Sequence, residues 1–370
     1  MPSDVYFIDF RASMRRTLLD RFADLLMSAG FGALAEKKKL LAIKMHFGEI
    51  GNTAFLRPYF ARRAAEEAQK RGAIPYLTDC NTLYVGSRGR APEHLYAAFL
   101  NGYDYLGAGC PVIIGDGVRG DTETIIHKRI LNEEKQFYVG SEILRADGLL
   151  VLSHFKGHDQ TGFGGCIKNL GMGGGSRRGK LAIHSGNTPE VDTDACNGCA
   201  SCERWCSTGA IRVDGGVAKI DPNLCIGCGQ CIIACPEGAT QNQWDASVEQ
   251  LNRSITEYCY TIASQFGGRV LFVNVINQVS PNCDCWAVSD APIVPDIGIV
   301  AGTDAVAVDN AAVDLVNQSA GVAGSALGDN IAPGTDKFRA IFPNIDWSLQ
   351  LSHGEKIGLG SRNYKLIKLR

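Results

Sequence analysis

Apolar residues along the first third of the chain recur with the spacing of helices and buried strands in alternation. Segment 13–30 carries leucine and phenylalanine three and four positions apart and stops at Gly30, which is typical of an amphipathic helix. Short, mostly apolar runs, typical of buried strands, follow at 40–45, 74–78 and 112–114. Helical patterns at 57–71 and 92–101, each followed by a glycine, separate these predicted strands.

The same alternation continues later in the chain, with strands predicted at 149–153, 270–274 and 297–300 and helices at about 244–265 and 305–317. Strands that alternate with helices favour an α/β fold, in which helices cover a mostly parallel or mixed sheet. Residues 1–190 and 241–370 are therefore expected to form one discontinuous α/β domain. Residues 191–240 interrupt it and are expected to form a small α+β insert with a ferredoxin-like fold, because surface loops tolerate insertions.

Eight of the fourteen cysteines lie in two runs spaced C-x2-C-x2-C-x3-C, and the second run repeats the first 29 positions later. The runs are Cys196, Cys199, Cys202 and Cys206, then Cys225, Cys228, Cys231 and Cys235. This spacing is that of a bacterial ferredoxin with two [4Fe-4S] clusters, in which the last cysteine of each run ligates the cluster of the other run. Cys235 is thus expected to complete the first cluster and Cys206 the second. Structural zinc held by CxxC pairs is the alternative.

Composition and charge describe an ordinary globular protein, with 21% charged residues and a net charge of −2 over 370 residues. This charge gives no attraction to nucleic acid or to an anionic membrane. No apolar run approaches the roughly 18–20 residues that a membrane span needs. The first residues lack the basic-then-apolar layout of a secretory signal, and cysteines committed to clusters favour a reducing compartment. We therefore expect a cytoplasmic protein.

Residues capable of chemistry follow the predicted strands. In a parallel sheet the carboxyl ends of the strands share one edge, where such folds bind ligands. The candidates for proton transfer and substrate positioning are His46, His154, Lys156, His158, Lys168 and His184. The candidates for binding a cofactor are Asp79, Asn81, Cys283 and Cys285.

Sequence spacing alone does not decide whether these candidates bind a metal or have only structural roles. His154 and His158 are four residues apart, which suits a metal site on a helix but is equally compatible with hydrogen-bonded histidines in a loop. Cys283 and Cys285 are too close in sequence for a comfortable disulfide. They are expected to be metal thiolates, a redox-active pair or two unreactive thiols.

Several phrases of the sequence resemble the iron–sulfur protein family called domain of unknown function 362, in its form with an inserted two-cluster ferredoxin. These phrases are residues 44–49, 79–84, 153–158, 165–173 and 283–285. The resemblance spans nearly the whole chain, although Cys80 stands where the family usually has threonine. Residues 154–168 are also similar to the His…Gly-Gly-x-Lys phrase of the nickel-pincer lactate racemase family, which implies a cofactor or metal in a cleft.

These features favour an iron–sulfur oxidoreductase that passes electrons through two clusters to a metal, cofactor or small substrate in the α/β domain. An electron carrier needs only the insert of about 50 residues, so the remainder of the chain argues for a second role. The alternative is a non-catalytic ferredoxin-like carrier, or a metal or cluster chaperone, that docks to a partner enzyme. Each interpretation implies a redox partner protein. Iron alone would favour the carrier, whereas a further metal would favour a site in the large domain.

Overall fold

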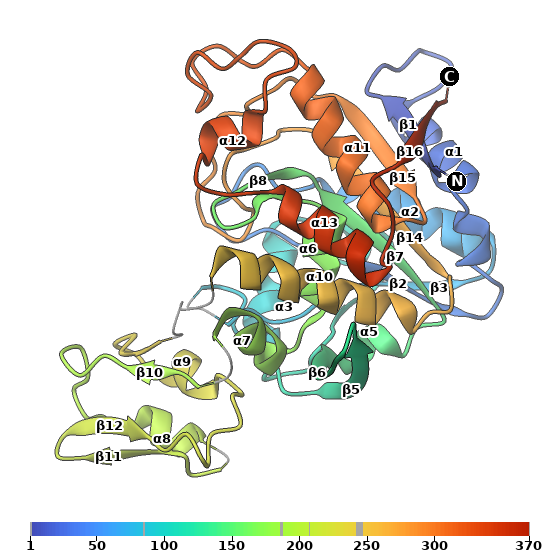
Figure 1. The fold of residues 1–370 in the computed structure, drawn as a ribbon. Helices are drawn as coiled ribbons and strands as arrows, with labels where there is room; N and C mark the ends of the chain where they lie inside the picture. Colours follow the sequence, from blue (N-terminus) through green and yellow to red (C-terminus); the bar gives the residue numbers. More distant parts are fainter. Residues whose placement is uncertain (1, 84–85, 186–187, 207, 242–246, 370) are drawn as a thin grey trace.

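The computed structural model describes residues 2–369 except 84–85, 186–187, 207 and 242–246, so Tyr84 of the 79–84 phrase lies outside the described residues (Figure 1). An eight-stranded sheet forms the centre of the molecule, with the strand order β16-β1-β15-β14-β7-β2-β3-β4. Its strands are β1 (Ser3–Asp9), β2 (Leu40–Lys44), β3 (Ile74–Asp79), β4 (Val112–Ile114), β7 (Gly148–His154), β14 (Val270–Ile276), β15 (Gly298–Gly302) and β16 (Tyr364–Lys368).

Five of the seven strand pairings in this sheet are parallel, and only β15 runs antiparallel to its two neighbours, β1 and β14. The predicted α/β fold with a mostly parallel or mixed sheet is confirmed. The paired strands β7 and β14 come from opposite sides of residues 191–240 in the sequence. The two flanks of the insert therefore contribute adjacent strands to one sheet.

Helices cover both faces of the sheet, which explains the mostly apolar runs. Along β7, Leu149 and Val151 belong to one core cluster, whereas Leu150 and Leu152 belong to the other. The first cluster packs against α6 (Cys166–Gly174), α10 (Val248–Ser264), α11 (Ala305–Gln318), α12 (Lys337–Ile341) and α13 (Ser348–Ile357). The second packs against α1 (Leu18–Ser28), η1 (Phe31–Ala33), α2 (Pro58–Lys70), α3 (Ala91–Leu100) and α4 (Tyr105–Ala108).

Local capping sets the start of α1 later than the hydrophobic pattern predicts. Thr17 accepts a hydrogen bond from the backbone N–H of Asp20, and the Asp20 carboxylate accepts one from the backbone N–H of Thr17. This capping box fixes Leu18 as the first helical residue. Shorter elements complete the large domain: β5 (Glu123–Ile130), β6 (Glu133–Gly140), α5 (Ser141–Leu144), β8 (Lys156–His158), β9 (Gly162–Gly164) and α7 (Arg177–Ser185).

The cysteine-rich segment projects from the large domain on a two-stranded stalk (Figure 1). The stalk pairs β10 (Glu190–Val191) with β13 (Thr240–Gln241) in antiparallel register. Beyond it lie α8 (Ser201–Trp205), β11 (Ile211–Asp214), β12 (Val217–Ile220) and α9 (Gln230–Ala234). The duplication is visible in the backbone, since Ala200 before α8 and Gly229 before α9 both adopt the left-handed conformation, with φ of 59° and 65°.

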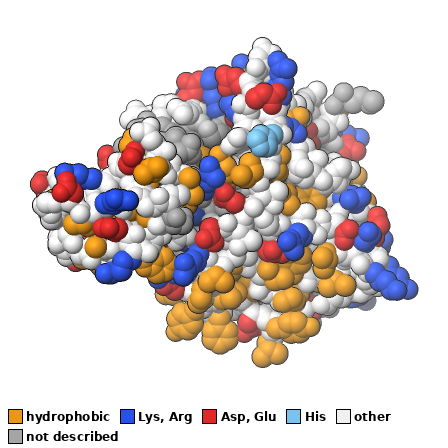
Figure 2. Space-filling view, turned by 90° about the horizontal axis from the view of Figure 1, so that it is seen from below, with side chains coloured by type: hydrophobic (Ala, Val, Ile, Leu, Met, Phe, Trp, Pro, Cys, Tyr) orange, Lys and Arg blue, Asp and Glu red, His pale blue; other side chains and the backbone are white. Residues whose placement is uncertain are grey.

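One surface of the large domain is unusually apolar (Figure 2). We call it the α3–α4 apolar face, and its members are Leu95, Tyr96, Phe99, Leu100, Tyr105 and Leu106. Each of these side chains is at least 40% exposed, and Leu106 is 84% exposed. In the described part of the chain, no helix combines the length and apolar character needed to cross a membrane.

Candidate functional site

The site lies where β7 and β14 end side by side, with His154 of β7 opposite Val275 of β14. The β8–β9 hairpin follows β7, and the segment containing Cys283 and Cys285 follows β14. The backbone N–H of Gly157 donates to the carbonyl of Ser280 at 2.8 Å, which joins the two segments. A side chain at position 157 would place its Cβ 2.5 Å from the carbonyl oxygen of Pro281, so glycine is required for this approach.

Asp284, between the two cysteines, fixes the position of their loop. Its carboxylate lies 2.9 and 3.0 Å from Nδ1 of His154 and 3.3 Å from Nζ of Lys156, and all three side chains are buried. Nε2 of His154 lies 2.7 Å from the carbonyl oxygen of Asn277, so both ring nitrogens of His154 face acceptors. Burial alone would raise the pKa of Asp284, but the neighbouring His154 and Lys156 lower it below its usual value.

His158, Cys283 and Cys285 form the tightest group of potential metal ligands. Their ligand atoms all lie within 4.8 Å of one another, and no other group of three or more histidine, cysteine or acidic side chains in the described residues is as compact. The backbone N–H of Gln160 donates to Nδ1 of His158 at 3.1 Å, which assigns the ring proton of a neutral His158 to Nε2. The structure therefore brings together three of the predicted candidates.

The hydrogen bond between the two cysteines shifts their pKa values in opposite directions. Hydrogen bonding from Cys285, and the nearby Lys168 and His158, hold the pKa of the Cys283 thiol well below its usual value despite burial. The same interaction, with burial, raises the pKa of Cys285. Nζ of Lys168 lies 3.7 Å from Sγ of Cys283, and the backbone N–H of Cys285 donates to the same sulfur at 3.4 Å. The surroundings of Cys283 thus favour its thiolate form more than those of Cys285 do.

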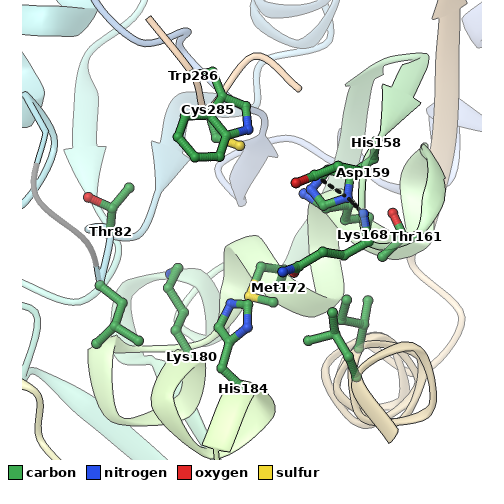
Figure 3. A pocket seen from close by; sticks show the side chains of 14 residues that line it. Thr82, His158, Asp159, Thr161, Lys168, Met172, Lys180, His184, Cys285 and Trp286 are labelled. Atoms are coloured by element: carbon green, nitrogen blue, oxygen red, sulfur yellow. Dashed lines mark hydrogen bonds and ion pairs between the residues drawn. The ribbon is translucent and has the colours of Figure 1, made fainter. Parts of the chain in front are cut away.

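A cavity of about 460 Å³ opens beside this group (Figure 3). Its lining residues are Thr82, Leu83, His158, Asp159, Gln160, Thr161, Lys168, Met172, Lys180, His184, Leu251, Ile255, Cys285 and Trp286. Lys168 and Met172 project from α6, and Lys180 and His184 project from α7. Burial, followed by the charges of Lys168, His158 and Lys180, lowers the pKa of His184 to about 3, so this ring is neutral.

Other predicted candidates lie at the same edge of the sheet but away from the cavity wall. Nε2 of His46 lies 2.8 Å from Nη1 of Arg88, whose Nε pairs with Oε2 of Glu49 at 2.9 Å. Burial and the Arg88 charge hold the pKa of His46 well below its usual value. Nη2 of Arg88 lies 3.5 Å from the carbonyl oxygen of Cys285. Arg88 therefore links His46 to the loop that carries Cys285.

Asp79 and Asn81 stabilise the strand ends. The carboxylate of Asp79 pairs with Nζ of Lys44 at 2.9 Å, in a site where both side chains are buried. Nδ2 of Asn81 donates to Oδ1 of Asp116 at 2.8 Å and to the carbonyl of Gly117 at 2.9 Å. Neither residue lines the cavity. The sequence pattern did not single out Met172 and Trp286 as cavity residues, because isolated apolar side chains carry no motif.

The eight cysteines of the insert surround two separate hollows. One is bordered by Cys206, Cys225, Cys228 and Cys231, and the other by Cys196, Cys199, Cys202 and Cys235. Each hollow thus receives three thiols from one run and one from the other. The backbone N–H groups of Ala210 and Ala239 donate to Cys206 and Cys235, each at 3.2 Å, in equivalent halves of the duplication.

The insert contacts the large domain through a small apolar cluster next to the cavity. Cys231 and Ile232 of the insert pack against Leu83 and Leu181. Leu83 also lines the cavity, so one side chain belongs to both the apolar cluster and the cavity wall. A side chain at position 229 would place its Cβ 2.7 Å from Cδ1 of Leu83, which shows how closely the insert loop approaches the cavity wall.

Polar contacts secure the same interface. Nε2 of Gln230 donates to the carbonyl of Arg119 at 2.8 Å. The ring of Trp205, next to Cys206, lies 4.8 Å from the guanidinium carbons of both Arg90 and Arg119. Two cation–π contacts of this kind are each worth on the order of 0.5–1 kcal/mol at partly exposed sites.

Comparison with known proteins places most of the chain in one family. The model described as "Domain of unknown function (DUF362)" matches residues 41–314. Among solved structures, the chain is similar to the lactate racemase apoprotein from Thermoanaerobacterium thermosaccharolyticum, with 14% identity and a TM-score of 0.35. That match covers 59% of this chain and 46% of the racemase chain. No curated protein matches the sequence.

We predict that Asp284→Ala destabilises the protein by about 3–5 kcal/mol, because it leaves the buried His154 and Lys156 facing no carboxylate. The free energy of unfolding, measured by urea denaturation, tests this prediction. Asp290→Ala, which changes an exposed carboxylate in the same segment, is the matched control and should cost under about 1 kcal/mol. Equal losses in the two variants would contradict the anchoring role of Asp284.

Proposed function

The chain belongs to the DUF362 family, and we propose that this member is an iron–sulfur oxidoreductase. In this proposal, residues 191–240 are an inserted ferredoxin domain within a discontinuous α/β domain of residues 1–190 and 241–370. The insert receives electrons from a redox partner protein. The cavity of the α/β domain holds the metal, cofactor or small substrate that is reduced or oxidised.

The arrangement of the insert thiols fits two [4Fe-4S] clusters. Each hollow is bordered by four cysteines in the crossed combination typical of a two-cluster ferredoxin. A tetrahedral zinc site with Zn–S bonds of about 2.3 Å needs thiolates only about 3.8 Å apart. No three of these eight thiols lie within 4.8 Å of one another, so the hollows are wider than a single zinc ion requires. When bound, such clusters supply one-electron transfer.

The observation that carries the proposal is the wall shared by the insert and the cavity. Leu83 belongs to the apolar cluster against which Cys231 packs, and it also lines the cavity. This cluster therefore joins the cysteine-rich segment to the cavity wall. The contacts of Trp205 and Gln230 hold the insert in this position.

Within the cavity, His158, Cys283 and Cys285 offer imidazole and thiolate ligands for a further metal. This ligand set suits iron, zinc or nickel, whereas calcium and magnesium prefer oxygen ligands. The lowered pKa of Cys283 favours the thiolate, which is the form that binds metals. Lys168, whose pKa is raised by the Cys283 thiolate although burial opposes the change, is the cation that balances this charge and the candidate proton donor.

We predict that the anaerobically purified protein carries about eight irons and eight acid-labile sulfides per chain. Cys206→Ser should damage the cluster bordered by Cys225, Cys228 and Cys231, and Cys235→Ser the other, each reducing the iron content to about four. Iron and sulfide analysis with electron paramagnetic resonance of the reduced protein measures both effects. Two zinc ions without sulfide would contradict the cluster assignment.

We also predict one metal per chain beyond the cluster iron, bound in the cavity. The double change Cys283→Ser, Cys285→Ser should remove this metal and leave the visible absorption of the clusters intact. The matched control is Cys110→Ser, Cys259→Ser, which alters two buried thiols outside the site. If anaerobic elemental analysis finds only the cluster iron in the wild type, the metal site in the cavity is wrong and the electron-carrier function gains support.

A further inference from the structure

The cavity carries more basic than acidic groups. Its cationic side chains are Lys168 and Lys180, which lie beside the imidazoles of His158 and His184, and the only acidic side chain among its described lining residues is Asp159. The Asp159 side chain is 53% exposed, and its carboxylate lies 3.3 Å from Nδ1 of His158. This carboxylate therefore lies at the mouth of the cavity, where water screens its charge.

The basic groups converge on one part of the cavity. Figure 3 shows Lys168, Lys180 and His184 extending from α6 and α7 toward the space beneath Cys285 and Trp286. An anion bound there would be attracted to the ammonium groups of Lys168 and Lys180.

The rest of the wall is apolar. Leu83, Met172, Leu251, Ile255 and Trp286 line the same cavity of about 460 Å³. This volume suits a small organic molecule, and apolar walls with a few convergent charged groups are typical of such sites. No arginine occurs among the described lining residues, although arginine is the side chain best suited to grip phosphate with two hydrogen bonds.

We propose that the cavity binds an organic carboxylate, with its carboxylate near Lys168 and Lys180 and its apolar body along Leu251 and Ile255. This inference names the substrate class of the proposed oxidoreductase and rests on that function. It is tested by binding alone, without turnover.

The test is calorimetric titration of the anaerobic holoprotein with straight-chain carboxylates from acetate to octanoate. Each added methylene should tighten binding by about fourfold until the cavity is full. Lys180→Gln should weaken octanoate binding at least tenfold. Lys180→Arg, which keeps the charge, should recover most of the affinity. Lys365→Gln, at an exposed position on β16, is the control and should bind like the wild type.

Three outcomes would overturn this assignment: octanamide or octylamine binding as tightly as octanoate, inorganic phosphate binding as tightly as octanoate, or no binding of any carboxylate at millimolar concentration. Metal content is measured on the same samples. Loss of carboxylate binding with full metal content rejects only the substrate class. Normal carboxylate binding by protein that lacks cluster iron and acid-labile sulfide rejects the iron–sulfur function instead.

A separate observation concerns the α3–α4 apolar face. With Tyr59 of α2, which is 62% exposed, it presents four aromatic side chains that together expose on the order of 500 Å². Leu95, Leu100 and Leu106 add exposed apolar area and bring the total near the roughly 800 Å² that each partner contributes to a standard interface. Monomeric proteins rarely expose contiguous apolar patches larger than about 300–600 Å².

We infer that a second copy of this chain covers the α3–α4 apolar face. The members of the face are all uncharged, and permanent interfaces between identical chains are richer in apolar area than the small surfaces of transient redox partners. The neighbouring strand β4 is the last strand of the sheet, so its outer edge pairs with no described strand of the same chain. A twofold axis beside β4 would bury both apolar faces together.

Analytical ultracentrifugation of the holoprotein should give twice the chain mass of 39.8 kDa at micromolar concentration. The double change Tyr96→Asp, Phe99→Asp should give the monomer mass, with iron content and circular dichroism unchanged. Met14→Asp, which alters a fully exposed methionine outside the face, should remain a dimer. A monomeric wild type, or a dimer that survives the double change, would overturn the inference.

Discussion

The carboxylate of Asp284 is the contact on which the candidate site depends. His154 and Lys156 approach it from the end of β7, while the loop that carries it follows β14. A buried carboxylate is stable only when opposite charges and hydrogen bonds compensate for lost hydration, and these two side chains supply that compensation. Once Asp284 is fixed, Cys283 and Cys285 on either side of it are held facing His158 and Lys168. Anchor and candidate ligands thus occupy consecutive positions of one short loop.

The sequence predicted the parts of the molecule that depend on local pattern. The apolar runs of β2, β3, β7 and β14 were visible because these strands are buried on both faces. The edge strand β16 was missed because its residues alternate between half-buried and exposed positions. Strand β1 was also missed, although its seven residues include the apolar run at 5–8.

Within the candidate site, residue type was easier to predict than role. The strand-end rule gathered His154, His158 and the two cysteines at one edge, as the structure places them. It could not tell that His154 faces Asp284, because that depends on a partner 130 positions away. The far wall of the cavity comes from Leu251 and Ile255 of α10, whose apolar spacing has the same appearance in any helix that packs on a sheet.

The order of strands in the central sheet has a consequence for synthesis on the ribosome. Strand β14 pairs with β7, yet it is translated only after the whole insert has been made. At typical elongation rates, β7 waits on the order of ten seconds for this neighbour. During that interval one edge of a strand that is buried along its whole length has no partner, which is the situation in which nascent chains aggregate. If the insert folds rapidly once its stalk strands β10 and β13 pair, less disordered chain remains beside the unpaired edge of β7.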